Sequence, residues 1–429
     1  MTALTEPRPA THDVHRTLNP AATDRLLPIR PAYGWADHLS RLGPLHPATT
    51  QRLGQSLDAA GLLGRGGAGF PTGRKVLAVA AAVAGTRLPA VVVANCCEGD
   101  PTSYKDQVLI SRSPHLVIDG AVAAATAVGA DRIVLAAHEN SAAQRILAVA
   151  VAERPGATQG IEVVGLPHRY IASEATALVR FLNSGDARPV GKLLPIWERG
   201  VGGRPTLVDN AETLAQLALI ARFGPEWFAA LGTAAEPGTT LVSIGGAVPR
   251  PGVVEVPHGA PLHDVLACAG AAPTGWALVG GLAGRLVDLS AMALIGYSTA
   301  QLAAAGATRG VGSMIVLPPG GCVLSETARI LHYQANAGAR QCGPCMFGLP
   351  AIAADMTDLV AGDRGALDRL RRRLPVIDGR GACSHPDGAV ALATSALSAL
   401  TTQQPGHLRQ HLTAGGCPAP APVVPLGAA

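Results

Sequence analysis

Apolar runs alternate with alanine-rich stretches through much of the first half of the chain. The apolar runs are rich in valine, isoleucine and leucine, as strands buried on both faces of a sheet are, and they occupy 88–96, 131–138 and 160–166. The alanine-rich stretches predict helices near 117–128, 141–152 and 173–183. Strands and helices in alternation indicate a parallel sheet with helices on its faces. The hydrophobic pattern therefore predicts an α/β domain over residues 51–236.

The pattern changes near residue 237. From there to about 320, apolar and polar residues alternate, turns are expected at 245–246 and 249–252, and a single helix follows. This order predicts a small β-rich module in which a sheet grasps one helix.

A helical pattern returns after the proline and glycine turn that ends this module. It predicts a helical bundle over 321–404, with breaks near 348–350, 362–365 and 375–381. The proline-rich residues 1–50 predict an N-terminal arm with a short helix near 34–42. Residues 405–429 are rich in alanine, glycine and proline, so we expect a disordered tail there.

The length, apolar runs and charge of the chain limit its number of domains, its location and its partners. A chain of 429 residues is long enough for two or three domains. Its longest apolar run, 76–85, has about half the length that a bilayer crossing needs, and its first residues lack the apolar core of a secretory signal. We therefore expect a cytoplasmic protein, at most peripheral to a membrane complex. The net charge of +4 is small and the basic residues are scattered, which argues against nucleic acid as a partner.

Cysteine and lysine are used selectively. The eight cysteines include the adjacent Cys96 and Cys97 and a Cys342-x-x-Cys345 spacing. This arrangement is unlike a disulfide framework and suggests metal or redox roles in a reducing compartment. Only three of the 34 basic residues are lysine, namely Lys75, Lys105 and Lys192. A compact ammonium is not equivalent to the planar fork of arginine, so all three are candidate site residues.

The strongest local signal is the glycine-rich stretch GLLGRGGAGFPTGRK at 61–75, which leads into an alanine-rich helix. Turns without side chains leave backbone N–H groups exposed, and together with a helix N-terminus they form a pocket for phosphate. A glycine run alone also fits a flexible loop. The helix that follows, with Arg65 and Lys75 in the same stretch, favours a nucleotide site.

A second signal follows the predicted strand at 88–96. The strand ends in ANCCEGDPTSYKD, so Asn95, Glu98 and Asp100 come directly after a buried run. Ligands of open α/β sheets bind beyond the carboxyl ends of the strands. An amide and two acids in that place suit the hydroxyl groups of a ribityl chain or a ribose.

Two further segments, 170–178 and 204–213, have the pattern of helix starts with a capping residue. Together, the four segments resemble the NADH-binding flavoprotein subunit of respiratory complex I and its relatives in NAD-reducing hydrogenases and formate dehydrogenases. The likeness covers about residues 35–400, in the same order and at compatible spacing. GRGGAGFPTGRK is similar to the family's flavin and NADH loop, and PTLVDNAET to its PTLVNNVET.

The resemblance implies a fold and a division into domains. The α/β class would be built from a Rossmann-like FMN- and NADH-binding domain, a ubiquitin-like β-grasp module of the SLBB type and a C-terminal helical bundle that binds an iron–sulfur cluster. The implied boundaries are 1–50 for the arm and short helix, 51–236, 237–320, 321–404, and 405–429 for the tail.

The resemblance also implies roles for single residues. Asn95 and Asn210 would contact FMN, Phe70 would stack on the adenine of NADH, and Glu98 would lie beside the nicotinamide. Glu174 corresponds to the first of two adjacent family glutamates. Gly64, Gly66, Gly67 and Lys75 would hold the flavin phosphate or the nicotinamide nucleotide. The full set of expected cofactor-binding residues is Gly64, Arg65, Gly66, Gly67, Phe70, Lys75, Asn95, Glu98, Asp100, Tyr170, Glu174, Lys192, Asp209 and Asn210.

The chain departs from the family pattern at several of these positions. Cys97 stands where the family has an aspartate, Ala175 replaces the second glutamate, and Asp209 replaces the first asparagine of a pair. Residues 76–78 read Val-Leu-Ala where Trp-Ser-Phe is usual. Each aromatic stack on adenine is worth about 0.5–1.5 kcal/mol, so the thinned cluster implies NADH binding about tenfold weaker, or a preference for another nucleotide.

The family's four-iron cluster uses a Cys-x-x-Cys-x-x-Cys run and a distant cysteine. Cys342, Cys345 and Cys383 match three of these positions, and Ala339 occupies the fourth. One interpretation is a 4Fe-4S cluster held by the three cysteines and one non-family ligand, which would be Asp387, His385, Cys322 or solvent. A zinc ion on the three cysteines and His385 is a second. A site without metal is the third. Cys268 and Cys417 lie outside any motif and are expected in the core and the tail.

The resemblance implies an NADH-oxidising flavoprotein (diaphorase) subunit. Hydride would pass from NADH to FMN, and single electrons would then pass through an iron–sulfur cluster to a partner oxidoreductase subunit, a ferredoxin-like acceptor or a quinone reductase complex. No side chain is expected as a catalytic acid or base, since the flavin carries the chemistry. Two alternatives stay open: a degenerate assembly subunit that keeps the fold without catalysis, and a flavoprotein that uses NADPH or ferredoxin.

Overall fold

The computed structural model describes residues 24–29, 33–46, 52–155, 160–191 and 195–426. Its first large unit contains a four-stranded sheet with the order β3-β2-β1-β4, in which every neighbouring pair is parallel. The strands are β1 (Ala90–Asn95), β2 (Ala130–His138), β3 (Ile161–Leu166) and β4 (Thr206–Asn210). The predicted strands at 88–96, 131–138 and 160–166 are confirmed as β1, β2 and β3. The mixed α/β class with a parallel sheet is confirmed as well.

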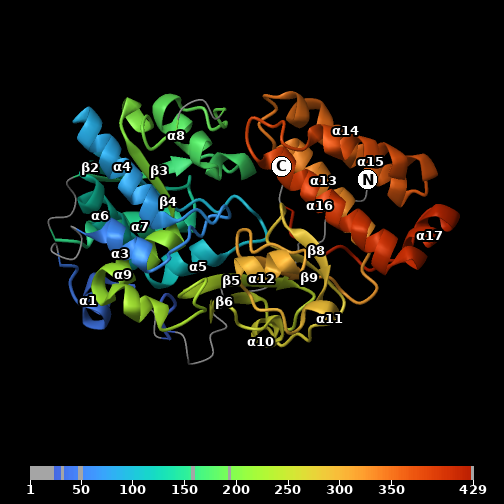
Figure 1. Ribbon diagram of the computed structural model, residues 1–429, viewed down its shortest axis with the longest axis horizontal. Helices are drawn as coiled ribbons and strands as arrows, with labels where there is room; N and C mark the ends of the chain where they lie inside the picture. Colours follow the sequence, from blue (N-terminus) through green and yellow to red (C-terminus); the bar gives the residue numbers. More distant parts are fainter. Residues whose placement is uncertain (1–23, 30–32, 47–51, 156–159, 192–194, 427–429) are drawn as a thin grey trace, which may run out of the picture.

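Helices cover both faces of this sheet (Figure 1). Ala90, Val92 and Ala94 of β1 share one buried cluster with α3, α4, α6 and α9, whereas Val91 and Val93 face α8. The helices of this unit are α1 (Trp35–Leu42), α3 (Leu53–Ala59), α4 (Thr72–Thr86), α5 (Lys105–Arg112), α6 (Pro114–Val128), α7 (Ala142–Ala152), α8 (Ala175–Ser184) and α9 (Ala211–Ala229). Side chains at alternate positions of a strand point to opposite faces of the sheet. Because helices cover both faces, the β1 positions on each face are apolar.

Helices α6 and α9 approach each other very closely. A Cβ atom on Gly120 of α6 would lie 1.9 Å from the carbonyl oxygen of Leu214 in α9. Only glycine allows this contact. The pair forms the centre of the largest buried cluster, in which Leu116, Leu214 and Leu217 are fully buried.

One element of this unit was missed by the sequence pattern. Residues 204–213 were predicted as a plain helix start, but residues 206–210 form β4, and α9 begins only after it. Burial in the sheet beside β1 overrides the local helix-start signal, as tertiary packing commonly does. The predicted capping residue is present: the Asn210 side chain caps α9 by accepting a hydrogen bond from the Glu212 N–H at 3.0 Å.

The second unit is a five-stranded mixed sheet with the order β6-β5-β9-β7-β8. Strands β5 and β9 are parallel and the other neighbouring pairs are antiparallel. The strands are β5 (Thr239–Gly246), β6 (Gly252–Pro257), β7 (Trp276–Val279), β8 (Arg285–Asp288) and β9 (Ser313–Val316). The helices are α10 (Leu262–Cys268), α11 (Leu289–Met292) and α12 (Thr299–Ala304). One face of the sheet buries Leu262, Val265 and Leu266 of α10.

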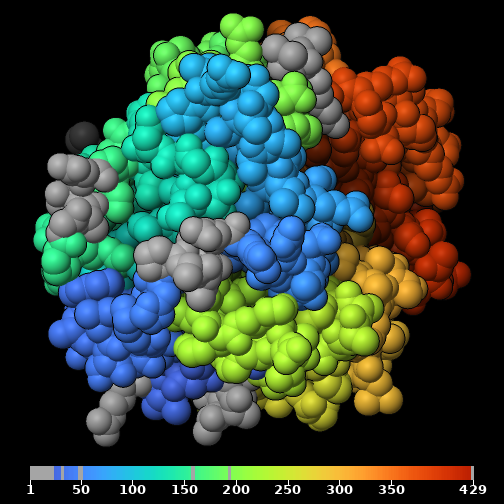
Figure 2. Space-filling model, turned by 60° about the vertical axis from the view of Figure 1, so that its left-hand side comes forward, coloured from blue at the N-terminus to red at the C-terminus, as the bar shows by residue number. Residues whose placement is uncertain are grey.

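The third unit is helical, as expected. It contains α13 (Val323–Ala337), α14 (Leu349–Val360), α15 (Arg364–Ile377), α16 (His385–Ser398) and α17 (Pro405–Ala414). Figure 2 shows these helices, in orange and red, packed against the side of the α/β unit. The break predicted near 348–350 is wrong, because a π-helical turn at Pro344–Gly348 runs directly into α14. Pro350 lies in the first turn of α14, where its missing N–H costs no hydrogen bond.

The prediction of a disordered tail at 405–429 is wrong for the described residues 405–426, which are ordered. Residues 405–414 form α17, and the segment after it packs on α13. Val424 is buried, and the Val423 N–H donates to Glu326 Oε1 at 2.6 Å. Leu408 and Val424 bury apolar area in the helical core, which offsets the entropy of ordering a proline-rich segment.

Within the described residues, no single helix is long and apolar enough to cross a membrane. Helices α5 and α6 pass such a test only as a pair, and they are bent by 97° relative to each other.

Candidate functional site

The polar residues at the ends of β1 and β4 lie side by side. The register pairs Asn95 with Asn210 and Ala94 with Asp209. The chain runs from β1 through β2 to β3 in one direction across the sheet and then returns to place β4 on the other side of β1. This reversal makes the β1–β4 boundary the topological switch point, where open α/β sheets bind their ligands.

The glycine-rich loop lies over the end of β4. A Cβ atom on Gly66 would be 3.5 Å from the Cβ of Asn210. Gly66, Gly67 and the following Ala68 are exposed. Gly67 has a backbone φ of +109°, a value that residues with a side chain rarely adopt. Helix α4 begins at Thr72, just after the loop. The loop therefore presents bare backbone at a helix N-terminus beside two asparagine side chains, which fits a phosphate group.

The side chain of Arg65 lies beneath this surface, and its expected role at the cofactor stays a prediction. It is 1% exposed, its Nη2 donates to the Thr239 carbonyl oxygen at 3.1 Å, and its Nε lies 3.7 Å from Glu212 Oε1. Burial and, to a smaller extent, the nearby Arg309 lower the pKa of Arg65 to about 10. Arg65 therefore ties the glycine loop to the second unit from beneath.

Lys75, in the first turn of α4, reaches the end of β4. Its Nζ lies 2.5 Å from Asp209 Oδ1 and donates to the Val208 carbonyl oxygen at 3.0 Å. Asp209 Oδ2 is buried and has no hydrogen-bond partner, and burial raises the pKa of this carboxyl group. A buried acceptor without a donor is costly, so a ligand that brings an N–H or O–H group to Asp209 fits this place.

Lys105 has a different environment. It is buried, and its Nζ lies 2.8 Å from Asp106 Oδ1 and 2.9 Å from Glu212 Oε2. Burial lowers the pKa of Lys105, but the two carboxylates outweigh this and raise it. The same Nζ donates to Asn210 Oδ1 at 3.2 Å, and Asn210 Nδ2 donates to Asp106 Oδ2 at 2.6 Å. This ion-pair network fixes Asn210 at the switch point. Lys192 lies outside the described residues.

The two acidic residues that follow β1, Glu98 and Asp100, have different hydrogen-bond partners. Glu98 accepts hydrogen bonds from Ser103 Oγ at 2.6 Å and from two N–H groups at the start of α5, at 3.2 Å each. Burial and, to a smaller extent, the nearby Asp106 carboxylate raise the pKa of Glu98 to about 7. Asp100, expected at the ligand, is 7% exposed and accepts from Thr102 and from the Leu282 N–H at 2.8 Å. Asp100 therefore joins the end of β1 to the second unit, and its expected role at the cofactor stays a prediction.

A short segment, Tyr170–Ser173, connects the switch point to the helical unit. Asn95 Nδ2 donates to the Ser173 carbonyl oxygen at 2.8 Å. The ring of Tyr170 lies 5.3 Å from the ring of His385 and 6.2 Å from that of Tyr333, both in the helical unit. Glu174 caps α8 by accepting from the Ala177 N–H at 3.0 Å. Phe70 is 49% exposed at the end of the glycine loop, so its ring is free to stack on a ligand.

The three cysteines of the expected cluster lie near one another. Cys345 is on the π-helical turn, Cys342 precedes it, and Cys383 precedes α16. Burial raises the pKa of both Cys345 and Cys383, and the neighbouring thiols of Cys342 and Cys345 add to the rise at Cys383. The Arg340 N–H donates to Cys345 Sγ at 3.2 Å. The three thiols are thus close enough to influence one another's pKa, and Ala339 has no ligand atom to offer at the fourth position.

His385 is the best placed of the alternatives for the fourth corner. A Cβ on Gly338 would lie 2.6 Å from Cys345 Sγ and 3.2 Å from His385 Nε2, so both groups approach the same point. His385 Nε2 donates to the Gln334 carbonyl oxygen at 2.8 Å, so it carries the ring proton, and Nδ1, which is buried without a partner, is the nitrogen left to bind a metal. Asp387 instead accepts from the Gly379 N–H.

Cys322 is too distant to be that ligand. It caps the N-terminus of α13, whereas Gly338 caps its C-terminus. The 15 residues of α13 separate the two ends by about 22 Å, at about 1.5 Å per residue. Cys322 instead belongs to a second cluster with His407, His411 and Cys417. This cluster was not predicted from the sequence, although the His-x-x-x-His spacing at 407–411 was a signal for it.

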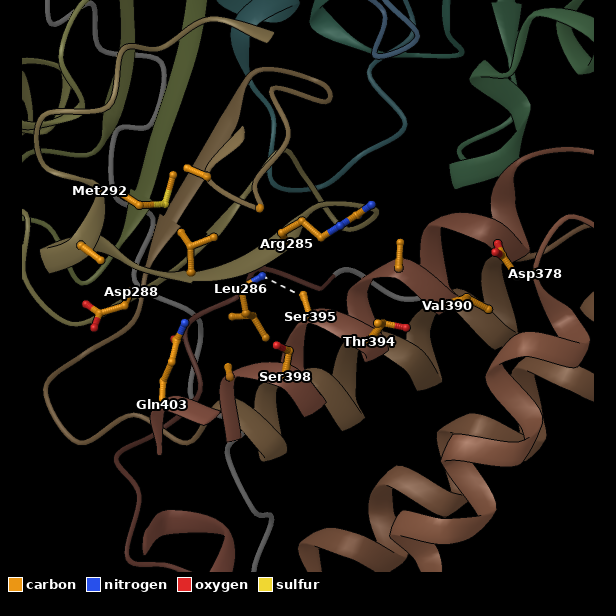
Figure 3. Close-up of a pocket in the computed structure, with 16 residues that line it drawn as sticks. Arg285, Leu286, Asp288, Met292, Asp378, Val390, Thr394, Ser395, Ser398 and Gln403 are labelled. Atoms are coloured by element: carbon orange, nitrogen blue, oxygen red, sulfur yellow. Dashed lines mark hydrogen bonds between the residues drawn. The ribbon is translucent and has the colours of Figure 1, made fainter. Parts of the chain in front are cut away.

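A cavity of about 490 Å³ lies between β8 and α16, away from both sites (Figure 3). Arg285, Asp288, Thr394 and Ser398 are among its lining residues, and the Leu286 N–H donates to Ser395 Oγ across it. Neither the glycine loop nor a cysteine lines this cavity. It belongs to the junction between the second and third units.

Switch-point asparagines, a glycine loop before a helix and a cysteine-bearing helical unit together define a nucleotide-binding redox protein. Known family models match both parts: the Nuo51 FMN-binding domain at residues 57–219, and the NADH-ubiquinone oxidoreductase-F iron–sulfur binding region at residues 325–403. The F subunit of NADH-quinone oxidoreductase from Rickettsia bellii is 30% identical over 358 residues, which cover 78% of this chain and 85% of that protein. The chain therefore belongs to the family of NADH-quinone oxidoreductase F subunits.

Other relatives extend the comparison. NADP-reducing hydrogenase subunit HndC of Solidesulfovibrio fructosivorans is 28% identical, with 85% of this chain and 76% of that protein covered. A crystal structure of an NAD+-reducing NiFe hydrogenase in the air-oxidized state matches with a TM-score of 0.79 and 27% identity, covering 95% of this chain and 69% of that one.

Proposed function

We propose that this chain is an NADH-oxidising flavoprotein subunit that passes electrons from NADH through FMN and an iron–sulfur cluster to a partner protein. The observation that carries this proposal is the pairing of Asn95 with Asn210 at the switch point, beneath the exposed glycine loop. Both family models, for an FMN-binding domain and an iron–sulfur region, support it.

We assign the FMN phosphate to the N–H groups of Gly66 and Gly67 and to the ammonium of Lys75. These groups offer positive charge and free donors at a helix N-terminus. Asn95 and Asn210 would bind the ribityl side. Asp209 Oδ2 needs a donor, which a ribityl hydroxyl or a ring N–H supplies.

We assign the nicotinamide nucleotide to the open side of the same edge. Phe70 would stack on the adenine because its ring is half exposed. Glu98, whose pKa is raised to about 7 by burial and by Asp106, would change charge near neutral pH beside the nicotinamide. Glu174 would act indirectly, since its carboxylate is held by the N-terminus of α8.

Bound FMN would supply the redox chemistry, by taking two electrons from NADH and releasing them one at a time. The protein's own contribution is positioning. Asn95 bonds to Ser173, and Tyr170 of the same segment contacts the ring of His385 beside the cysteines. The residues that would hold the cluster are Cys342, Cys345 and Cys383, with His385 as the fourth ligand.

The finer assignments follow from this function. The second sheet has the order of a ubiquitin-like β-grasp, with parallel β5 and β9 at its centre, and we infer that it is an SLBB module. The proposed domains are 51–236, 237–320 and 321–404, the arm being 1–50. The relatives carry the word subunit in their names, which supports a partner oxidoreductase subunit or a ferredoxin-like acceptor. A cytoplasmic location, peripheral to a membrane complex, is part of the proposal.

One observation favours the alternative of a non-catalytic assembly subunit. Asp209 stands in place of the family's asparagine and neutralises Lys75 at 2.5 Å, which weakens the pull of this lysine on a phosphate. The two functions differ in whether the chain binds FMN.

Titration of the purified full-length chain with FMN, followed by flavin fluorescence, tests the proposal. The expected result is one FMN per chain, together with iron and acid-labile sulfide in protein prepared without oxygen. A chain that binds no FMN after reconstitution, while circular dichroism shows it folded, would contradict the proposal and favour the assembly role.

A further inference from the structure

Four metal-binding side chains meet at the N-terminal end of α13, far from the flavin edge. Cys322, His407, His411 and Cys417 each direct one ligand atom to a common point, and all four atoms lie within 4.8 Å of one another. Cys322 and His411 are buried, and the other two are partly buried. Among the described residues, this is the one group of at least three such side chains at this spacing.

Local structure explains how these residues meet. His407 and His411 are four residues apart on α17, so they share one face of the helix, and their rings stack at 5.2 Å. Gly415 ends α17 with a φ of +69°, which turns the chain back toward Cys417. Cys322 comes from the cap of α13. Three separate chain segments thus converge.

The distances are those of a tetrahedral zinc site. His411 Nε2 lies 3.3 Å from His407 Nε2 and 3.3 Å from Cys322 Sγ. A zinc ion binds histidine nitrogen at about 2.0–2.1 Å and thiolate sulfur at about 2.3 Å, so tetrahedral geometry separates two nitrogens by about 3.3 Å and a nitrogen and a sulfur by about 3.5 Å. The ligand atoms are too close together to surround a multi-iron core.

Hydrogen bonds on the far side of each ring orient the histidines for metal binding. His411 Nδ1 lies 2.8 Å from the Val360 carbonyl oxygen, which only accepts, so this nitrogen carries the proton. His407 Nδ1 faces Gln404 Oε1 at 3.2 Å in the same way. Both Nε2 atoms then direct lone pairs toward the same point, 3.3 Å apart, with Cys322 Sγ 3.3 Å from His411 Nε2, an arrangement that suits a cation at that point. Such outer hydrogen bonds are typical of zinc-binding histidines.

The thiols have suitable surroundings as well. The Ser325 N–H donates to Cys322 Sγ at 3.3 Å, and the N-terminus of α13 favours a thiolate there. A cavity of about 540 Å³ between the second unit and α17 is lined by residues 316–321, Gln404 and His407. His407 thus lies in the wall of this cavity.

We propose that Cys322, His407, His411 and Cys417 bind one structural zinc ion that fastens α17 and the C-terminal segment to α13. Binding converts two thiols to thiolates and releases their protons to solvent, with no change in oxidation state. A site closed by four protein ligands leaves no position for substrate, which is the pattern of a structural zinc. The proposal is independent of the flavin chemistry and of the iron site at the other end of α13.

Metal analysis of the full-length chain, purified under reducing conditions and desalted after addition of equimolar Zn²⁺, tests this. The expected result is one tightly held zinc per chain, with two sulfur and two nitrogen ligands in its X-ray absorption spectrum. That spectrum needs no variant, so it does not depend on any substitution being tolerated. A chain that retains no zinc, or one whose zinc has three or more sulfur ligands, overturns the proposal.

Variants separate this site from the iron site. H407N and C417S are each expected to lower retained zinc at least tenfold and to leave the iron content unchanged. C268S and H332N are the matched controls, because Cys268 and His332 lie outside both clusters, and they should keep one zinc. Zinc that persists in H407N and C417S, or that is lost instead in C342S, overturns the assignment.

Discussion

The switch-point edge of the first sheet and the cysteine end of α13 lie on either side of the Tyr170–Ser173 segment, but they are built differently. At the switch point, charged groups are already paired within the protein, as Lys105 is with Asp106 and Glu212. At the cysteine end, three thiols lie close enough to influence one another's pKa, and Ala339 stands where a fourth cysteine is expected. One region is held together by its own ion pairs, whereas the other is completed only by what it binds.

This difference predicts that substitutions at the switch-point ion pairs destabilise the fold, whereas substitutions of the cysteines only remove the bound metal. A buried charge that loses its partner destabilises the fold. A thiol that loses its metal remains a small buried apolar group.

The largest expected effect is that of K105M. It leaves Asp106 and Glu212 buried without their cation, which should lower the free energy of unfolding by about 3–5 kcal/mol. Urea denaturation measures this. R132M is the control, since Arg132 forms an exposed pair with Glu162 and should change stability by less than about 1 kcal/mol. An equal loss in both variants would show that Lys105 does not hold the switch point together.

At the cysteine end, C345S should remove the iron. Iron content should fall from about four per chain to near zero, while FMN binding stays unchanged because Cys345 belongs to the helical unit and to neither the glycine loop nor the switch point. Iron and flavin analysis of one preparation checks both. Loss of FMN together with iron would break the distinction between the two regions.

K75M should weaken FMN binding by about tenfold to a hundredfold, since a hydrogen bond to a charged group contributes about 1.5–3 kcal/mol. Fluorescence titration measures the dissociation constant. R74M, which alters the exposed neighbour in the same helical turn, should bind FMN as the parent does. If the two variants bind alike, Lys75 serves only its ion pair with Asp209.

F70A should raise the KM for NADH by about twofold to tenfold, the value of one aromatic stack, with the affinity for FMN unchanged. F347A is the control, because Phe347 is equally apolar and 71% exposed at the cysteine end. An unchanged KM in F70A would remove Phe70 from the nucleotide site.

The smallest effect concerns pH. Burial and Asp106 raise the pKa of Glu98 to about 7 in the folded protein, above its unfolded value, so the folded state holds the extra proton. Stability should therefore fall as pH rises from about 4.5 to 7, and E98Q should reduce that fall. Thermal unfolding across this range tests it, with E162Q as the surface control. A slope that E98Q leaves unchanged would contradict the raised pKa.

The sequence predicted the elements whose signal is local. Strands β1 to β3 and the helices α6 and α7 followed from apolar periodicity, and the placement of Asn95 at a strand end followed from strand order. Strand β4 was missed because TLVDN is short and its neighbour β1 lies 115 residues earlier in the register. Only the sheet pairing identifies it.

Side-chain direction could not be predicted from the sequence. Arg65 and Asp100 stand in the right segments, but both turn inward to bind the second unit. The cluster of Cys322 with His411 was missed because 89 residues separate the two. Cys417 lies in a stretch whose composition suggested a tail, so its partners became visible only in three dimensions.

The most direct test of the proposed activity is the absorption spectrum of the FMN-loaded chain during anaerobic addition of NADH. Transfer of electrons from NADH predicts that the oxidised flavin bands bleach on addition of about one NADH per FMN. FMN that stays bound and oxidised in excess NADH would contradict the central claim.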